Sequence, residues 1–359
     1  MWLTMLKRHN VWLWGACALL ALASLTSISS SNPELARVQT VWFLGAFGVM
    51  VALGVFDLRP IMSYRWAIFG IYFFSLLLLI ATFFFAPVIR ETRSWLAIGP
   101  LRFQPAEFSK IALIILLAYF LSRRHTRIGQ SANIAASFVY ALIPAVFILL
   151  QPDWGSAIVI FGLWIGFLFV SGVNVRHMVI GFLIALVVSL TAWFFILAPY
   201  QKERVIGFFK PAYDPLGVNY SVIQSKIAIG SGGVWGKGFN QGTQTQLGFL
   251  TEPETDFIFA AIVEEWGMLG ALVLLGAFVL LIVSIVRIGL RLDDPLSQFV
   301  CLGAAVLFLV EFILNVGSNI GFVPVVGVTF PLVSYGGSSL LTKAMLIGII
   351  QSIAARSSF

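Results

Sequence analysis

The sequence predicts an all-α polytopic membrane protein, a single integral membrane domain spanning residues 1–359 with about ten transmembrane helices. Hydrophobic residues make up 60% of the chain, charged residues make up 10%, and the mean hydropathy is +0.98. This leaves too little charge to solvate a globular surface. Apolar runs of about 20 residues recur along the chain, which is the length that crosses a bilayer as a helix. Because these runs do not alternate, we expect helices rather than barrel strands.

Each predicted helix is an apolar run bounded by charged residues or by proline and glycine. Lys7 and Arg8 precede the first run, which we interpret as a retained helix because no small-residue cleavage site follows it. Six more runs follow at short intervals, a long loop separates the seventh from the eighth, and a proline- and glycine-rich stretch precedes the tenth. The predicted helices cover residues 11–28, 40–56, 66–86, 106–122, 133–150, 154–171, 177–198, 257–286, 299–317 and 336–354.

Lysine and arginine residues gather at one set of helix ends. With ten spans, the same side carries Lys7, Arg8, Arg59, Arg65, Arg123, Arg124, Arg127, Arg176, Arg287, Arg291 and Arg356. By the positive-inside rule this side, with both termini, is cytoplasmic, and the loop 199–256 is extracytoplasmic. The net charge of +7 is spread over span ends and not clustered with aromatic residues, so we expect anionic headgroups and no nucleic acid as partners.

The loop 199–256 is too long to be only a connection, so we expect it to be functional. Residues 222–229 have one apolar and one polar face, suited to an interfacial helix with Lys226 directed at headgroups or a phosphate. The glycine-rich stretch 230–238 is compatible with an anion-binding turn, although such stretches are common.

Three carboxylates, those of Glu252, Glu254 and Asp256, end this loop immediately before an apolar run. Asp256 has two interpretations that the spacing leaves open. It caps the following helix, as Thr255 equally can, or it is a general base whose pKa is raised by the apolar flank and the neighbouring acids.

A few charged residues fall within or beside the apolar runs. Glu107 and Lys110 are three residues apart and share a helix face, so they form a structural ion pair, or Lys110 contacts a diphosphate while Glu107 holds it. Lys343 has no nearby acid and must face a cavity or a distant partner. Asp153 lies in a tight turn and either caps the next helix or contacts substrate.

Prolines and glycines, among them Pro324, Gly327 and Pro331, interrupt the apolar run between residues 315 and 339. Broken backbone at membrane depth persists only where protein buries it or where it lines a cavity. We therefore expect a re-entrant segment before the last helix, bounding a polar cavity.

Four sequence motifs follow one another along the chain. The first three are Arg102-Phe103-Gln104-Pro105-Ala106-Glu107 with Lys110, Gln151-Pro152-Asp153-Trp154-Gly155-Ser156-Ala157, and Thr255-Asp256-Phe257-Ile258-Phe259-Ala260 with Glu264-Glu265-Trp266-Gly267. The fourth and most specific runs from Asn315 through Gly321-Phe322-Val323-Pro324 and Gly327-Val328 to Leu332-Val333-Ser334-Tyr335-Gly336-Gly337-Ser338-Ser339. Together, in this order, the four motifs resemble the SEDS (shape, elongation, division and sporulation) family of bacterial cell-wall polymerases.

The resemblance implies polymerisation of lipid II, a disaccharide-pentapeptide on undecaprenyl diphosphate, at the outer face of the cytoplasmic membrane. It implies that Asp256 is the catalytic base for an inverting transfer that forms a β-1,4 bond. The departing diphosphate needs positive charge from Lys110, Arg102, Lys226 or a divalent cation such as Mg²⁺ or Mn²⁺, whose ligands the sequence does not identify. The candidate substrate-binding residues are Arg102, Gln104, Glu107, Lys110, Asp153, Lys226, Glu252, Ser334, Ser338 and Lys343.

One departure from the family pattern matters. Members commonly carry Pro-Glu-x-His-Thr-Asp-Phe, whereas Pro253 and Glu254 stand here at the variable and histidine positions. A mechanism that requires that imidazole is therefore not expected, while the base assignment to Asp256 is unaffected.

The resemblance further implies a class B penicillin-binding protein transpeptidase as partner, within a wall-elongation complex. Two alternatives remain at this stage. A transporter that flips the lipid-linked precursor would suit the broken helices and the intramembrane Lys110 and Lys343, although no inverted repeat is visible. A non-catalytic scaffold would not depend on Asp256.

Overall fold

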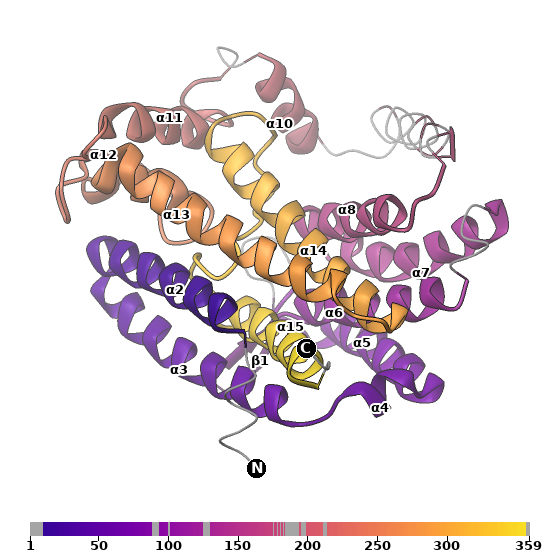
Figure 1. The fold of residues 1–359 in the computed structure, drawn as a ribbon. Helices are drawn as coiled ribbons and strands as arrows, with labels where there is room; N and C mark the ends of the chain where they lie inside the picture. The colour runs from indigo at the N-terminus through magenta and orange to yellow at the C-terminus, as the bar shows by residue number, and fades with distance from the viewer. Residues whose placement is uncertain are drawn as a thin grey trace.

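The computed structural model describes residues 10–87, 93–99, 101–124, 130–174, 199–210 and 214–356, with isolated positions between 176 and 194. In these residues the chain is nearly all helical (Figure 1). The helices are α2 (Val11–Ser31), α3 (Pro33–Val55), α4 (Arg59–Ser63), α5 (Arg65–Phe85), α6 (Pro105–Ser122), α7 (Ser131–Leu149), α8 (Trp154–Val170), α10 (Pro199–Phe209), α11 (Tyr220–Gly232), α12 (Thr243–Gln246), α13 (Ile258–Leu290), α14 (Pro295–Asn319) and α15 (Gly337–Arg356). A short hairpin pairs β1 (Leu96–Ile98) with β2 (Leu101–Phe103).

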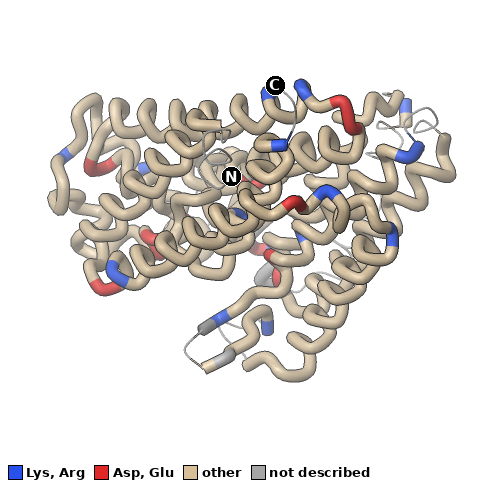
Figure 2. The backbone as a smooth tube through the Cα atoms, turned by 60° about the horizontal axis from the view of Figure 1, so that its bottom comes forward, with Lys and Arg blue, Asp and Glu red and all other residues tan. Residues whose placement is uncertain are grey.

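Eight of the described helices are long and apolar enough to cross a membrane, namely α2, α3, α5, α6, α7, α13, α14 and α15, and α8 is a shorter apolar helix. The predicted class of polytopic helical membrane protein is confirmed. Nine of the ten predicted spans overlap these helices, and the remaining one, 177–198, lies largely outside the described residues. Charges are sparse along most of the helices (Figure 2).

The largest shift in a helix boundary is at α3, which begins at Pro33 and not near residue 40. The Asn32 side chain accepts the Leu35 N–H at 3.2 Å, and proline at the first helical position is already set for helix. The polar residues of this first turn hide the helix start from a search for apolar runs.

Two helices, α6 and α15, form the centre of the bundle (Figure 1). α15 packs on α3 and α6, while α6 also packs on α5 and α14. α14 packs in turn on α8 and α13, and α13 packs on α2 and α11. Since α6 and α15 are surrounded by protein rather than lipid, polar groups on them can be paired inside the bundle.

The helix α13 is broken at Gly267, where φ is 65° and ψ is −163°. The break is closed by the turn after α11: the Lys237 N–H donates to the Glu264 carbonyl at 3.0 Å, and the Met268 N–H donates to the Gly233 carbonyl at 2.9 Å. A Cβ at Gly267 would collide with the Gly236 backbone nitrogen. The glycine-rich stretch 230–238 therefore completes a helix break, and the amides of its last residues donate to protein carbonyls.

One end of the bundle joins α3, α4 and α15. Asp57 pairs with Arg59 at 3.0 Å and lies 3.6 Å from Arg356 Nε. The hydrogen bond from Arg59 is the main cause that lowers the pKa of the Asp57 carboxyl from its ordinary value of 3.8. The opposite end holds the starts of α6, α8, α13 and α15 and the end of α14, and there the candidate site lies.

Candidate active site

Asp256 lies two residues before α13 and is partly exposed. Its backbone carbonyl accepts hydrogen bonds from Asn319 Nδ2 at 2.8 Å and Asn315 Nδ2 at 3.1 Å. Both amides come from the last turns of α14, so the position of Asp256 is fixed by a helix far away in the sequence. The N-cap of α13 is Phe257, one residue later than a capping role for Asp256 requires.

The irregular segment between α14 and α15 packs against the chain around Asp256. Ser334 Oγ donates to the Thr255 carbonyl at 2.6 Å, and the Tyr335 N–H donates to the Glu254 carbonyl at 2.8 Å. A Cβ at Gly327, where φ is +71°, would lie 3.8 Å from Asp256 Oδ2, so a glycine borders the carboxylate on this side. Ser334, a predicted substrate contact, is buried and here holds the acidic loop in place.

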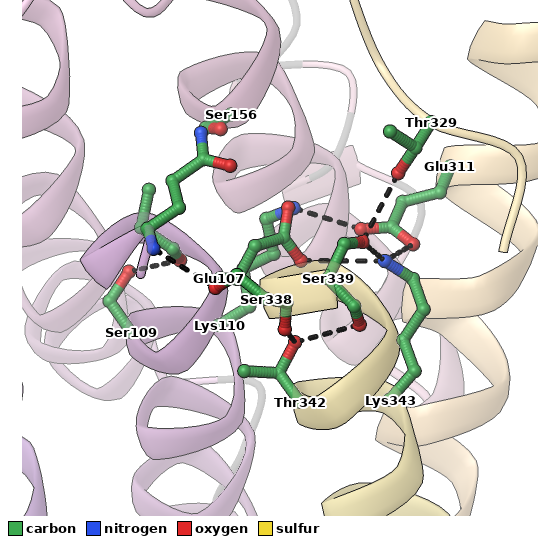
Figure 3. A network of polar contacts seen from close by, with 12 residues as sticks. Glu107, Ser109, Lys110, Ser156, Glu311, Thr329, Ser338, Ser339, Thr342 and Lys343 are labelled. Atoms are coloured by element: carbon green, nitrogen blue, oxygen red, sulfur yellow. Dashed lines mark hydrogen bonds and ion pairs between the residues drawn. The ribbon is translucent and has the colours of Figure 1, made fainter. Parts of the chain in front are cut away.

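Four buried charges form a closed ring in the centre of the bundle (Figure 3). Lys110 Nζ lies 2.7 Å from Glu107 Oε1 and 2.8 Å from Glu311 Oε1. Lys343 Nζ lies 3.1 Å from Glu311 Oε2 and 3.4 Å from Glu107 Oε2. Each lysine bridges both carboxylates, and each carboxylate uses both oxygens, so the ring is electrically neutral.

The ring joins three helices, because α6 contributes Glu107 and Lys110, α14 contributes Glu311, and α15 contributes Lys343. Both lysine side chains are only 2% exposed. This geometry favours the ion-pair interpretation of Glu107 and Lys110 over direct contact with a diphosphate. It also supplies the distant partners that the sequence required for Lys343.

A polar path connects the ring to the candidate base. Lys343 Nζ also donates to Ser339 Oγ, which lies 3.2 Å from Thr329 Oγ1. The Val328 carbonyl, one residue earlier, accepts from Asn315 Nδ2 at 2.8 Å, and the same amide holds the Asp256 carbonyl. The ring therefore braces the segment that borders Asp256.

Gln104, Ser338 and Asp153 are brought together beside the ring. The Gln104 N–H donates to Ser338 Oγ at 2.9 Å, and Gln104 Nε2 donates to Asp153 Oδ2 at 2.9 Å. Asp153 also caps α8 by accepting the Ser156 N–H at 3.0 Å. Of the two interpretations of Asp153, the capping one is therefore present in the structure.

The remaining candidates lie outside this network. Arg102 is exposed on β2, and Lys226 is exposed on α11. Glu252 is partly exposed in a left-handed conformation, with φ at 49°, and its Oε2 accepts from Thr255 Oγ1 at 3.4 Å. The structure thus connects Asp256, Ser334 and the ring through one hydrogen-bond network. Arg102 and Lys226 lie outside this network as exposed cations.

Glu311 and Asn319 were not singled out from the sequence. An acid inside a predicted span is a signal in itself, and Glu311 is such a residue. Asn319 had no comparable signal, because its role depends on the end of α14 meeting the start of α13.

No group of three or more His, Cys, Asp or Glu residues suited to hold a metal ion occurs in the part of the chain that the structure describes. These side chains therefore do not fit a divalent cation held by the protein alone.

The chain is similar along nearly its whole length to proteins of one known family. The family model described as "Cell cycle protein", for FtsW, RodA and SpoVE, matches residues 4–358. The chain is 36% identical over 338 residues to the peptidoglycan glycosyltransferase MrdB of Escherichia coli K12, covering 94% of this chain and 90% of the relative. It is 34% identical over 355 residues to the probable peptidoglycan glycosyltransferase FtsW of Haemophilus influenzae, covering 96% and 89%.

Two solved structures are similar throughout. A chain from a peptidoglycan synthase complex, studied for the coordination of polymerization and crosslinking, has a TM-score of 0.84 and 31% identity, covering 98% of this chain and 99% of that chain. The rod shape determining protein RodA of Thermus thermophilus has a TM-score of 0.73 and 26% identity, covering 98% of both chains.

Proposed function

The chain belongs to the FtsW/RodA/SpoVE (SEDS) family, and we propose that it is a peptidoglycan glycosyltransferase that polymerises lipid II during cell elongation. The curated relatives described above are named for this activity, and the match extends over nearly the whole chain.

The observation that carries the mechanism is a partly exposed carboxylate on a fixed backbone. Asp256 is held through its carbonyl by Asn315 and Asn319, and Gly327 borders its Oδ2 without a side chain. Asp256 accepts the proton of the 4-hydroxyl of the acceptor GlcNAc as that oxygen attacks the anomeric carbon of the donor MurNAc. The bond to the diphosphate breaks on the opposite face, so the α-linkage becomes a β-1,4 bond and no covalent enzyme intermediate forms.

The leaving diphosphate carries negative charge that needs a cation nearby. Arg102 and Lys226 suit this role because both are exposed. Lys110 and Lys343 are each bonded to two carboxylates, so they suit positioning, by bracing the segment around Asp256. The ion pairs of Lys110 and Lys343 also weaken the transporter hypothesis, because that hypothesis used these lysines to guide an anion and both are paired with carboxylates in the ring.

The active site is extracytoplasmic in this proposal, and both termini are cytoplasmic. The support is the distribution of arginines, since Arg123, Arg124, Arg287, Arg291 and Arg356 all lie toward the end of the bundle away from Asp256. A class B transpeptidase is the partner, in keeping with the similar chain from a complex that couples polymerization to crosslinking.

The test is Asp256→Asn in purified protein supplied with lipid II. We expect polymer formation to fall by at least the roughly 10²–10⁴-fold that a general base contributes, because an amide cannot accept the proton. The matched control is Asp293→Asn, an exposed acid at the opposite end of the bundle, which should retain activity. Thermal unfolding of both variants should resemble that of the parent, and polymerisation retained by Asp256→Asn would reject the assignment.

A further inference from the structure

A cavity of about 140 Å³ lies between α10, α11 and the segment that follows α14. Its apolar lining includes Phe208, Val222, Val323, Pro324 and Val325, and Lys226 is the single charged residue among the described residues that line it. We call it the Lys226 cavity. An apolar chamber with one cation suits a ligand that is itself part apolar and part anionic.

Lys226 has no ion-pair or hydrogen-bond partner among the residues that the structure describes. Its ammonium lies over Gly321, where a Cβ would collide with it, and φ of Gly321 is +72°. Gly321 follows the end of α14, whose partial negative charge favours a nearby cation only weakly. The lysine therefore retains its capacity to bind an anion.

The Lys226 cavity adjoins the candidate base, Asp256, because both are held by Asn319 and by the segment that follows α14. Ser225 Oγ donates to the Asn319 carbonyl at 2.8 Å, and Asn319 Nδ2 donates to the Asp256 carbonyl at 2.8 Å. The segment that supplies Pro324 and Val325 to the cavity continues to Gly327, which borders the Asp256 carboxylate. A phosphate at Lys226 would thus be held at the same end of the bundle as the reacting sugar.

The size of the cavity limits what it can enclose. A volume of about 140 Å³ is close to that of an engineered protein cavity of about 150 Å³ that binds benzene, so it holds roughly six carbon atoms and not a whole lipid chain. The rest of a long chain would leave toward the bilayer.

We propose that the Lys226 cavity binds the phosphate-proximal end of an isoprenoid diphosphate, with Lys226 on a phosphate oxygen and the apolar lining around the first isoprenoid carbons. This assignment rests on the proposed function, because a lipid-linked diphosphate is both the donor's leaving group and the anchor of the acceptor. Anionic phospholipid shares with this ligand a phosphate next to an alkyl chain, and free pyrophosphate shares the phosphate alone, so these two are the competing ligands.

The test measures binding of undecaprenyl diphosphate to the full chain in phosphatidylcholine nanodiscs. Undecaprenol, phosphatidylglycerol and inorganic pyrophosphate serve as competitors. We expect Lys226→Gln to weaken binding by roughly ten- to a hundredfold, the range for losing a hydrogen bond to a charged group. Lys226→Arg should restore most of it, and the matched control Lys202→Gln, on α10 and outside the cavity lining, should bind like the parent.

A second variant tests the apolar part of the ligand. Val222→Trp fills the cavity and keeps the lysine, so it should weaken binding of undecaprenyl diphosphate but leave binding of pyrophosphate unchanged. Undiminished binding by Lys226→Gln would overturn the proposal, as would equal competition by phosphatidylglycerol or pyrophosphate.

Polymerisation of lipid II, measured on the same samples, distinguishes failure of the proposed function from failure of the cavity assignment. If the parent protein binds undecaprenyl diphosphate through Lys226 but makes no polymer, the proposed function fails and the cavity assignment stands. If the parent makes polymer and Lys226→Gln binds normally, only the cavity assignment fails. Asp256→Asn should bind undecaprenyl diphosphate like the parent and make no polymer.

Discussion

Removal of Glu311 from the buried ring should destabilise the fold strongly. Glu311 makes two of the four ion pairs, at 2.8 and 3.1 Å, and its side chain is fully buried. Each such contact has a gross attraction of about 5–6 kcal/mol at an effective dielectric constant of ~20, much of it offset by desolvation. Glu311→Gln leaves Lys110 and Lys343 sharing Glu107, so we expect a loss of about 3–5 kcal/mol, the range for breaking a buried pair.

A double variant makes this prediction specific to charge. Glu311→Gln with Lys343→Met leaves the neutral pair of Glu107 and Lys110, so it should be less destabilised than Glu311→Gln alone, with a coupling of about 0.5–3 kcal/mol. The assay is reversible unfolding in mixed micelles of rising SDS fraction, followed by tryptophan fluorescence. Glu203→Gln, an exposed acid on α10, is the matched control. A double variant as unstable as the sum of its parts would refute the reasoning.

Two further predictions concern the backbone break and one end of the bundle. Gly267→Ala should lower stability by at least about 1–3 kcal/mol in the same SDS unfolding assay, because alanine is strained at φ 65° and its Cβ would collide with Gly236. The control Gly276→Ala, in open space on the same helix, should be neutral or stabilising. Asp57→Asn should lower stability near pH 7 by less than about 1 kcal/mol, since the Asp57 side chain is 39% exposed. Because Arg59 lowers the pKa of Asp57 in the folded protein, the stabilisation by this ion pair is fully present above the ordinary pKa of 3.8 and is lost as the pH falls through the folded-state pKa. The unfolding curves of the parent and of Asp57→Asn should therefore converge in acid. A difference in stability that persists in acid would contradict a stabilising ion pair between Asp57 and Arg59.

The sequence predicted those features that depend on local spacing. Apolar runs located the spans, and the three-residue spacing placed Glu107 and Lys110 together. The partners of Lys343 were not predictable, because they lie on α6 and α14 and meet it only in the packed bundle. For the same reason spacing could not decide between a cap and a base at Asp256, since asparagines of α14 fix its position.

The helix predicted at residues 222–229 is present as α11, whereas the two short strands were not predicted from the sequence. The hairpin of β1 and β2 has only three residues in each strand, too few for a clear alternation. The glycine-rich stretch 230–238 was compatible with an anion-binding turn, and its pairing with the break at Gly267 depends on contacts between α11 and α13.

The neutral ring has a consequence for how the chain enters the bilayer during synthesis. Glu107 and Lys110 lie on one helix and arrive already matched, so α6 can partition into lipid without help from later segments. Glu311 and Lys343 arrive singly, on consecutive helices, and each is an uncompensated charge until the other is present. Both charges are compensated together only when α14 and α15 have packed against α6, so closure of the ring requires the last two spans.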